Sequence, residues 1–203
     1  MMYEAIKNFN KQFEYEPVVE NADKLEKKDK FIVAGMGGSH LSADILKISR
    51  PTLDMTIHRD YGLPDAMENR LLILSSYSGN TEEVVNAFEK GLENNLPIAV
   101  ISIGGKLIEL AREHSIPYVQ MPDTDIQPRN ALGYSLRALL KVIGDEETLK
   151  ELSNLSQTLY PTEYEEVGKA LSKKLKGKIP VIYSSTRNQS IAYNWKIKLN
   201  ETG

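Results

Sequence analysis

The stretch Leu71-Leu-Ile-Leu-Ser-Ser-Tyr-Ser-Gly-Asn-Thr-Glu-Glu83 decides the fold of this protein. Residues 71–74 form a short apolar run with the length of a buried strand, and residues 75–81 form a polar loop. Residues 82–94 carry apolar side chains at helical spacing, with two glutamates in the first turn, where they favour the positive end of the helix dipole. The stretch therefore predicts a strand, a loop and a helix in that order.

The same order of strand, loop and helix recurs along the chain. Further strands are predicted at 31–34, 54–58, 97–103 and 116–121, and further helices between Ser39 and Pro51, at 107–114 and at 129–143. Strands that alternate with helices form a parallel sheet covered on both faces. The sequence therefore predicts the α/β class, with a five-stranded parallel sheet flanked by helices.

The chain divides into four parts. Residues 1–30 predict an N-terminal helical segment, 31–144 the first α/β domain, and 145–177 a helical connector. Residues 178–203 repeat the pattern once more, with a strand at 179–183 followed by a helix. Because one strand cannot form a sheet alone, this last part is predicted to be the start of a truncated second domain.

Composition excludes several classes of protein. Of the 203 residues, 41% are hydrophobic and 26% are charged, which indicates a globular protein and argues against disorder. A net charge of −3 argues against a nucleic-acid partner. The chain has no cysteine, which excludes disulfides, cysteine zinc sites and thiol nucleophiles. The N-terminus lacks a signal-like pattern and the apolar runs are far shorter than the roughly 18 residues of a membrane span, so a cytoplasmic protein without a membrane partner is predicted.

The loop at 75–81 is the strongest functional signal. It offers the hydroxyls of Ser75, Ser76, Ser78 and Thr81, together with a glycine, at the start of a helix. A helix N-terminus presents free N–H groups and a partial positive charge, which suit a phosphate monoester. The alternative is a hydroxyl-rich turn that caps the helix.

A second loop, Gly35-Met-Gly-Gly-Ser39, follows its own strand in the same way. Ser39 is predicted to cap the next helix. A dinucleotide fingerprint requires a third glycine where this sequence has His40, so neither a nicotinamide nor a flavin cofactor is predicted. The three histidines lack metal-ligand spacing, and no metal site is predicted. Two such loops at adjacent strand ends indicate one ligand cradled between them.

Two charged residues are candidates for chemistry. Arg129 lies near the start of a helix, where a guanidinium can stabilise a developing oxyanion. The alternative is a surface arginine paired with Asp123 or Asp125. Glu201 is either an ordinary exposed helix residue or a base that moves a proton between neighbouring carbons.

Several segments, in this order, resemble one family: Gly35-Met-Gly-Gly-Ser39 with Asp44, the run from Ser76 to Glu83, Pro128-Arg129 with Gly133-Tyr134, and Trp195-Lys196 leading to Asn200-Glu201. They resemble the bifunctional phosphoglucose/phosphomannose isomerases of the sugar isomerase (SIS) domain superfamily. The resemblance implies two SIS domains and a homodimer. It also implies an enzyme, free of metal and cofactor, that interconverts glucose 6-phosphate or mannose 6-phosphate with fructose 6-phosphate.

The resemblance also implies roles for particular residues. The sugar phosphate would be held by Gly38, Ser39, Ser76, Ser78 and Thr81. Arg129 would stabilise a cis-enediolate, and Glu201 would shuttle the proton between C1 and C2.

One departure from the family pattern concerns the end of the chain. Family members have a ring-opening histidine shortly after the glutamate, and a lysine and a threonine near the C-terminus, whereas this sequence stops at Gly203. We therefore expect this chain to bind fructose 6-phosphate and to turn it over slowly or not at all. The alternatives are a non-catalytic sugar-phosphate sensor and an SIS isomerase of pentose or heptose phosphates.

Overall fold

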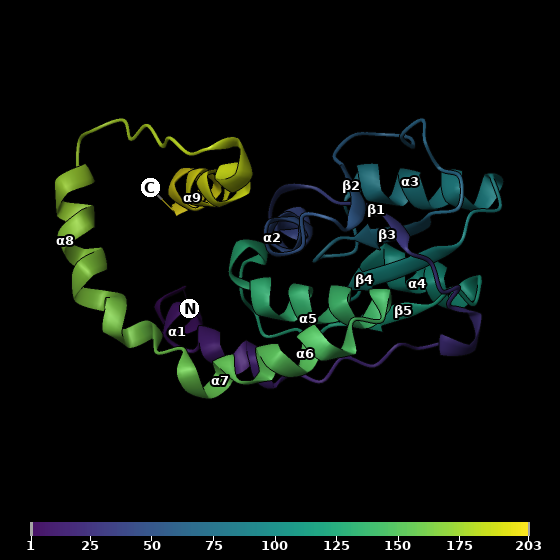
Figure 1. The fold of residues 1–203 in the computed structure, drawn as a ribbon, viewed down its shortest axis with the longest axis horizontal. Helices are drawn as coiled ribbons and strands as arrows, with labels where there is room; N and C mark the ends of the chain where they lie inside the picture. The colour runs from purple at the N-terminus through teal and green to yellow at the C-terminus, as the bar shows by residue number, and fades with distance from the viewer. Residues whose placement is uncertain (1, 203) are drawn as a thin grey trace.

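The fold is built on one parallel sheet, shown in Figure 1 for a computed structural model that describes residues 2–202. The strands are β1 (Lys30–Ala34), β2 (Asp54–His58), β3 (Leu71–Ser75), β4 (Ile98–Ser102) and β5 (Tyr118–Gln120). Their order across the sheet is β2-β1-β3-β4-β5, and every neighbouring pair is parallel. The predicted α/β class and the five-stranded parallel sheet are confirmed.

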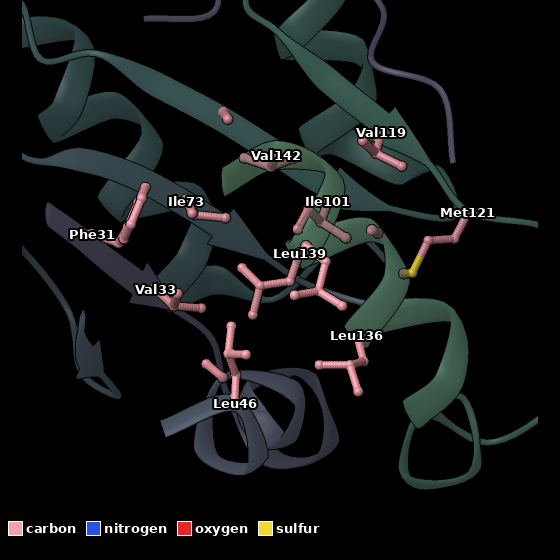
Figure 2. Packing of buried hydrophobic residues seen from close by; sticks show 14 of the residues in the cluster. Phe31, Val33, Leu46, Ile73, Ile101, Val119, Met121, Leu136, Leu139 and Val142 are labelled. Carbon is pink, nitrogen blue, oxygen red and sulfur yellow. The ribbon is translucent and has the colours of Figure 1, made fainter. Parts of the chain in front are cut away.

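Helices cover both faces of the sheet, because strand side chains alternate between the two faces. The helices involved are α2 (Leu41–Ser49), α3 (Glu82–Glu93), α4 (Gly105–Glu113) and α5 (Leu132–Ile143). On one face, Val33 and Ile73 pack against α2 and α5, as Figure 2 shows. On the other face, Ile32 and Leu72 pack against α3 and α4. The core is thus two apolar layers separated by the sheet.

The N-terminal segment is helical in part, as predicted. It forms α1 (Met2–Lys7) and two 3-10 helices, η1 (Phe9–Glu14) and η2 (Ala22–Lys24). Beyond η1 the chain runs to the far edge of the sheet, where Glu20 forms an antiparallel bridge with Tyr118 of β5. The segment therefore links the α5 side of the molecule to β5.

The connector at 145–177 is helical, as predicted. It comprises α6 (Glu146–Ser153), α7 (Leu155–Thr158), a 3-10 helix η5 (Pro161–Tyr164) and α8 (Glu165–Leu175). Within the described chain α8 contributes no buried residue, and it stands apart from the sheet in Figure 1. A short 3-10 helix η6 (Thr186–Asn188) then leads into α9 (Gln189–Thr202), which returns to lie beside α2.

The prediction of a strand at 179–183 is wrong. This segment forms no strand in the described structure, and its side chains are open to solvent, with Ile179 93% and Tyr183 90% exposed. A strand needs hydrogen bonds from a neighbouring strand, and none lies beside this segment within residues 2–202. The helix predicted after it is present as α9. Assignment of residues 178–203 to a second SIS domain stays a prediction.

Candidate functional site

The site lies where the strand order of the sheet reverses. From β1 the chain passes to β2 on one side, whereas β3, β4 and β5 follow on the other side. Open parallel sheets bind ligands in the crevice at the carboxyl ends of the two strands that flank such a switch point. Here these strands are β1 and β3, and the two loops that the sequence singled out follow them.

Hydrogen bonds join the two loops. The Ser75 hydroxyl donates to the Ser39 carbonyl over 2.8 Å, and the backbone N–H of Tyr77 donates to the Ser39 hydroxyl over 2.9 Å. Ser39 lies inside a 3-10 helix, η3 (Gly37–His40), so its predicted role as a helix cap is wrong. Its hydroxyl is used by the neighbouring loop, which supplies a buried N–H group that needs an acceptor.

The hydroxyls of the loop at 75–81 differ in how deeply they are buried. Ser76 is fully buried; its hydroxyl lies 2.7 Å from that of Thr81 and accepts the N–H of Gly79 over 3.1 Å. Ser78 is exposed. Thr81 is the N-cap residue of α3, yet its hydroxyl makes no capping bond within the described chain. Ser78 and Thr81 therefore lie at the surface of the loop, whereas Ser39 and Ser76 lie beneath it.

Arg129 reaches this site from the far edge of the sheet. It belongs to a 3-10 helix, η4 (Pro128–Asn130), which follows β5 and packs against η3. Gly38 makes this contact possible: a Cβ atom there would lie 2.8 Å from the Arg129 nitrogen and 2.9 Å from the Pro128 carbonyl carbon. The structure thus shows a packing reason for glycine at 38, in addition to its predicted place in the phosphate loop.

Arg129 and Glu201 form an ion pair. The Arg129 Nη1 lies 2.8 Å from the Glu201 Oε2, and Nη2 donates to the Glu201 backbone carbonyl over 3.2 Å. The Arg129 side chain is 10% exposed and the Glu201 side chain 43% exposed, so the carboxylate is the accessible partner. The alternative pairing of Arg129 with Asp123 or Asp125 is wrong, and the two candidate catalytic residues lie together.

Helix α9 is held in place by a cluster that sequence reasoning missed. The Tyr193 ring stacks on His40 at 5.5 Å, and the Arg59 guanidinium lies 5.2 Å from the Tyr193 ring centroid. Asp44 joins the cluster, at 2.7 Å from the His40 Nδ1 and 2.9 Å from the Arg59 Nη2. Tyr193 precedes Glu201 by eight residues, which is about two helical turns, so the two side chains lie near the same face of one helix. That spacing was the signal in the sequence that could have linked Tyr193 to the site.

Lys198 also lies close to the ion pair. Burial lowers the pKa of its ammonium, and the positive charge of Arg129 lowers it further. Burial also raises the pKa of Tyr77 in the hydroxyl loop. The described residues contain no group of three or more histidine or acidic side chains placed to hold a metal ion. None of the helices between residues 2 and 202 has the length and hydrophobicity needed to cross a bilayer.

A cavity of about 1260 Å³ lies beside this site. Its walls come from α2, β2, the segment 180–185, η6 and α9. Asp44, Arg59 and Tyr193 line it, and Asn200 places its edge next to Glu201. One edge of the cavity therefore lies next to the residue that carries the carboxylate of the ion pair.

No family model matches the chain. Comparison with curated proteins finds several similar sequences that carry the same name. The chain is 34% identical to the bifunctional phosphoglucose/phosphomannose isomerase of Caldicellulosiruptor bescii over 98% of this chain and 65% of that protein. It is 30% identical to the protein of the same name from Aquifex aeolicus, over 98% of this chain and 63% of that protein. The chain thus spans slightly less than two thirds of these relatives.

Solved structures agree on the fold. The glucosamine-6-phosphate deaminase of Thermotoga maritima superposes with a TM-score of 0.63 over 99% of this chain and 66% of that chain, at 21% identity. This likeness shows that the two chains share a fold. The sequence identities extend over nearly the whole chain, which is therefore similar throughout its length to the bifunctional phosphoglucose/phosphomannose isomerases.

Proposed function

We propose that this chain provides the phosphate site and the acid–base pair of an aldose–ketose isomerase. The substrates proposed are glucose 6-phosphate or mannose 6-phosphate on one side and fructose 6-phosphate on the other. The observation that carries the proposal is the Arg129–Glu201 pair, joined at 2.8 Å and packed through η4 against the loop that follows β1. The similarity of the chain to the bifunctional phosphoglucose/phosphomannose isomerase of Caldicellulosiruptor bescii supports the same reaction.

The phosphate is proposed to bind over the loop at 76–81. Ser78 and Thr81 offer hydroxyls at its surface, and the N-terminal amides of α3 lack acceptors within their helix. Ser39, Ser76 and Gly38 fix the shape of the cradle from beneath. This arrangement neutralises a phosphate largely through backbone N–H groups and hydroxyls.

The proposed reaction moves one proton between two carbons. The Glu201 carboxylate takes the proton from C2 of the open-chain aldose and returns it to C1, while the proton on O2 moves to O1. The intermediate is a cis-enediolate, and its negative oxygen would be stabilised by the Arg129 guanidinium. Opening of the sugar ring needs a further acid–base group. We propose that the whole protein works as a homodimer in the cytoplasm.

Isotope exchange tests the proton transfer without requiring full turnover. Fructose 6-phosphate incubated with the chain in D₂O should gain deuterium at C1, as measured by proton NMR. Glu201→Gln should slow this exchange by about 100-fold or more, because general base catalysis contributes factors of about 10²–10⁴. Binding of fructose 6-phosphate, measured by calorimetry, should change less than about threefold, since the phosphate contacts are intact.

The control is Glu163→Gln, at an exposed glutamate on η5, which should exchange at the wild-type rate. Exchange that is unaffected by Glu201→Gln would remove Glu201 from the mechanism. Tight binding of fructose 6-phosphate with no exchange in the wild-type chain would favour the sugar-phosphate sensor.

A further inference from the structure

Gln12 connects the N-terminal segment to the turn that carries Arg129. Its side chain is buried, with 3% of the residue exposed. Its Nε2 donates to the Asn130 carbonyl over 2.6 Å, and its Oε1 accepts the backbone N–H of Gly133 over 2.9 Å. Both partners belong to the junction between η4 and α5, about 120 residues further along the chain.

These two bonds cap both elements at their junction. The Asn130 carbonyl ends η4, and the Gly133 N–H belongs to the first turn of α5, where N–H groups lack intrahelical acceptors. Neither η4 nor α5 has a side-chain cap from its own N-cap residue in the described chain. A side-chain amide is the group that can donate to one partner and accept from the other at the same time.

The fit around Gln12 is close. A Cβ atom at Gly133 would lie 2.7 Å from the Gln12 Cβ and 3.0 Å from its Oε1, so glycine leaves the space that this side chain occupies. On the opposite side, Gly38 admits the backbone of Pro128 and Arg129. The η4 turn is thus held between the loop after β1 and the N-terminal segment. The position of this turn fixes the backbone of Arg129, from which the guanidinium extends.

We propose that Gln12 is a positioning residue for Arg129. The inference rests on the proposed function for the role of the guanidinium in the reaction, but the contact that it invokes is independent of that role. Loss of the two hydrogen bonds would let η4 shift relative to η3 and would move the Arg129 guanidinium away from the enediolate oxygen. Displacements of about 1 Å at a charge-stabilising group can cost up to about 100-fold in rate.

The chain offers a matched control on the same 3-10 helix. Asn10 also bonds a distant carbonyl, because its Nδ2 donates to Ser156 of α7 over 2.8 Å. This contact anchors η1 without touching the Arg129 turn. Gln12→Met and Asn10→Leu each replace an amide by an apolar side chain of similar size. Both variants lose a contact that anchors η1, but only Gln12→Met also frees the η4 turn that carries Arg129.

The test measures the binding affinities of two ligands and the chemical shift of one NMR resonance. Gln12→Met should weaken binding of a hydroxamate analogue of the phosphorylated enediolate about tenfold, and binding of inorganic phosphate by less than about twofold. It should also shift the NMR resonance of the buried Arg129 Nε–H, which has no hydrogen-bond partner among residues 2–202. Asn10→Leu should leave all three readouts at their wild-type values.

The two hypotheses fail in different ways. If Gln12→Met leaves the Arg129 resonance and the analogue affinity unchanged, the positioning role is wrong. If the wild-type chain binds the analogue no better than phosphate while Gln12→Met still shifts the resonance, the proposed function is wrong and the positioning contact stands. Should Gln12→Met fail to fold, Gly133→Ala displaces Gln12 from the other side and is expected to give the same three effects.

Discussion

Single glycines set the geometry of the hydroxyl loop at the residue scale. Gly79 has a φ of +74°, and a Cβ atom there would lie 1.8 Å from the Gly104 carbonyl oxygen, on the loop that follows β4. Two separate requirements therefore apply at this position: a left-handed backbone and direct contact between two loops. The first costs an L-residue about 1–2 kcal/mol, and the second forces one backbone to move.

Gly79→Ala should lower the free energy of unfolding by about 3 kcal/mol or more, as measured by urea denaturation. Gly37→Ala is the matched control, because Gly37 has a φ of +54° but nothing within 4 Å of its Cβ position. That variant should lose about 1 kcal/mol, the cost of the left-handed backbone alone. Equal losses in the two variants would show that the contact with Gly104 does not constrain the loop.

Helix α9 carries Glu201, and its docking is decided at the scale of whole elements. Most of its side chains are exposed or half-buried, and Ile197 is its buried residue. The aromatic contact of Tyr193 with His40 of η3, and the Arg59 guanidinium over the same ring, therefore supply much of what holds α9 beside α2. Such contacts contribute about 0.5–1.5 kcal/mol and 0.5–1 kcal/mol respectively.

Tyr193→Ala should release α9 from α2 and raise its opening equilibrium roughly 5- to 30-fold, which corresponds to a loss of about 1–2 kcal/mol. Trp195, the single tryptophan of the chain, lies on α9 and is 48% exposed, so it reports the release directly. Acrylamide should quench its fluorescence more strongly, and amides of α9 should exchange hydrogen faster. Tyr183→Ala, at a residue that is 90% exposed, should change neither measurement.

Elements and contacts differ in how far the sequence predicts them. The five strands of the sheet follow from local apolar runs bounded by turn residues, and each run has a neighbour to pair with. The run at 179–183 has the same composition, but pairing is not a local property, and the described chain offers it no partner strand. Local pattern thus predicts where strands are possible, and topology decides where they form.

The parts of the site also differ in how far local sequence predicts them. The hydroxyl loop and the Gly35–Ser39 loop were predictable, because each follows its strand directly. The pairing of Arg129 with Glu201 spans 72 residues, and that of Gln12 with Asn130 spans 118. Spacing within one segment carries no information on such pairs. The resemblance to a family implied that Arg129 and Glu201 act in one site but not that they pair, and nothing in the sequence indicated the contact of Gln12.

The N-terminal segment connects separate parts of the molecule, so it belongs to the scale of the whole fold. The fully buried Arg137 of α5 donates to the Tyr15 carbonyl and to Leu149 of α6, and the Tyr15 hydroxyl donates to the Gln120 carbonyl of β5 over 3.1 Å. Unfolding of this segment would leave buried polar groups of α5 without partners, at a cost of about 1–3 kcal/mol for each group. The segment should therefore unfold together with the sheet.

Tyr15 makes this coupling measurable through pH. Burial raises its pKa from 10.0 to about 12, and the charge of Arg137 offsets part of the rise. The folded protein keeps the phenol proton to a higher pH than the unfolded chain does, so unfolding releases a proton between about pH 10 and 12. The contribution of Tyr15 to stability is complete below pH 10 and is lost as the pH rises through about 12.

Tyr15→Phe removes the titrating group and keeps the ring that packs edge-on against Tyr134. Its free energy of unfolding, measured by urea denaturation followed by circular dichroism, should fall less steeply between pH 10 and 11.5 than that of the wild type. The difference in slope is bounded by about 1.4 kcal/mol per pH unit, the limit for one proton. Tyr183→Phe should keep the wild-type slope, because that ring is already in solvent. A wild-type slope in Tyr15→Phe would mean that the N-terminal segment opens before the sheet unfolds, and that the molecule does not unfold as one cooperative unit.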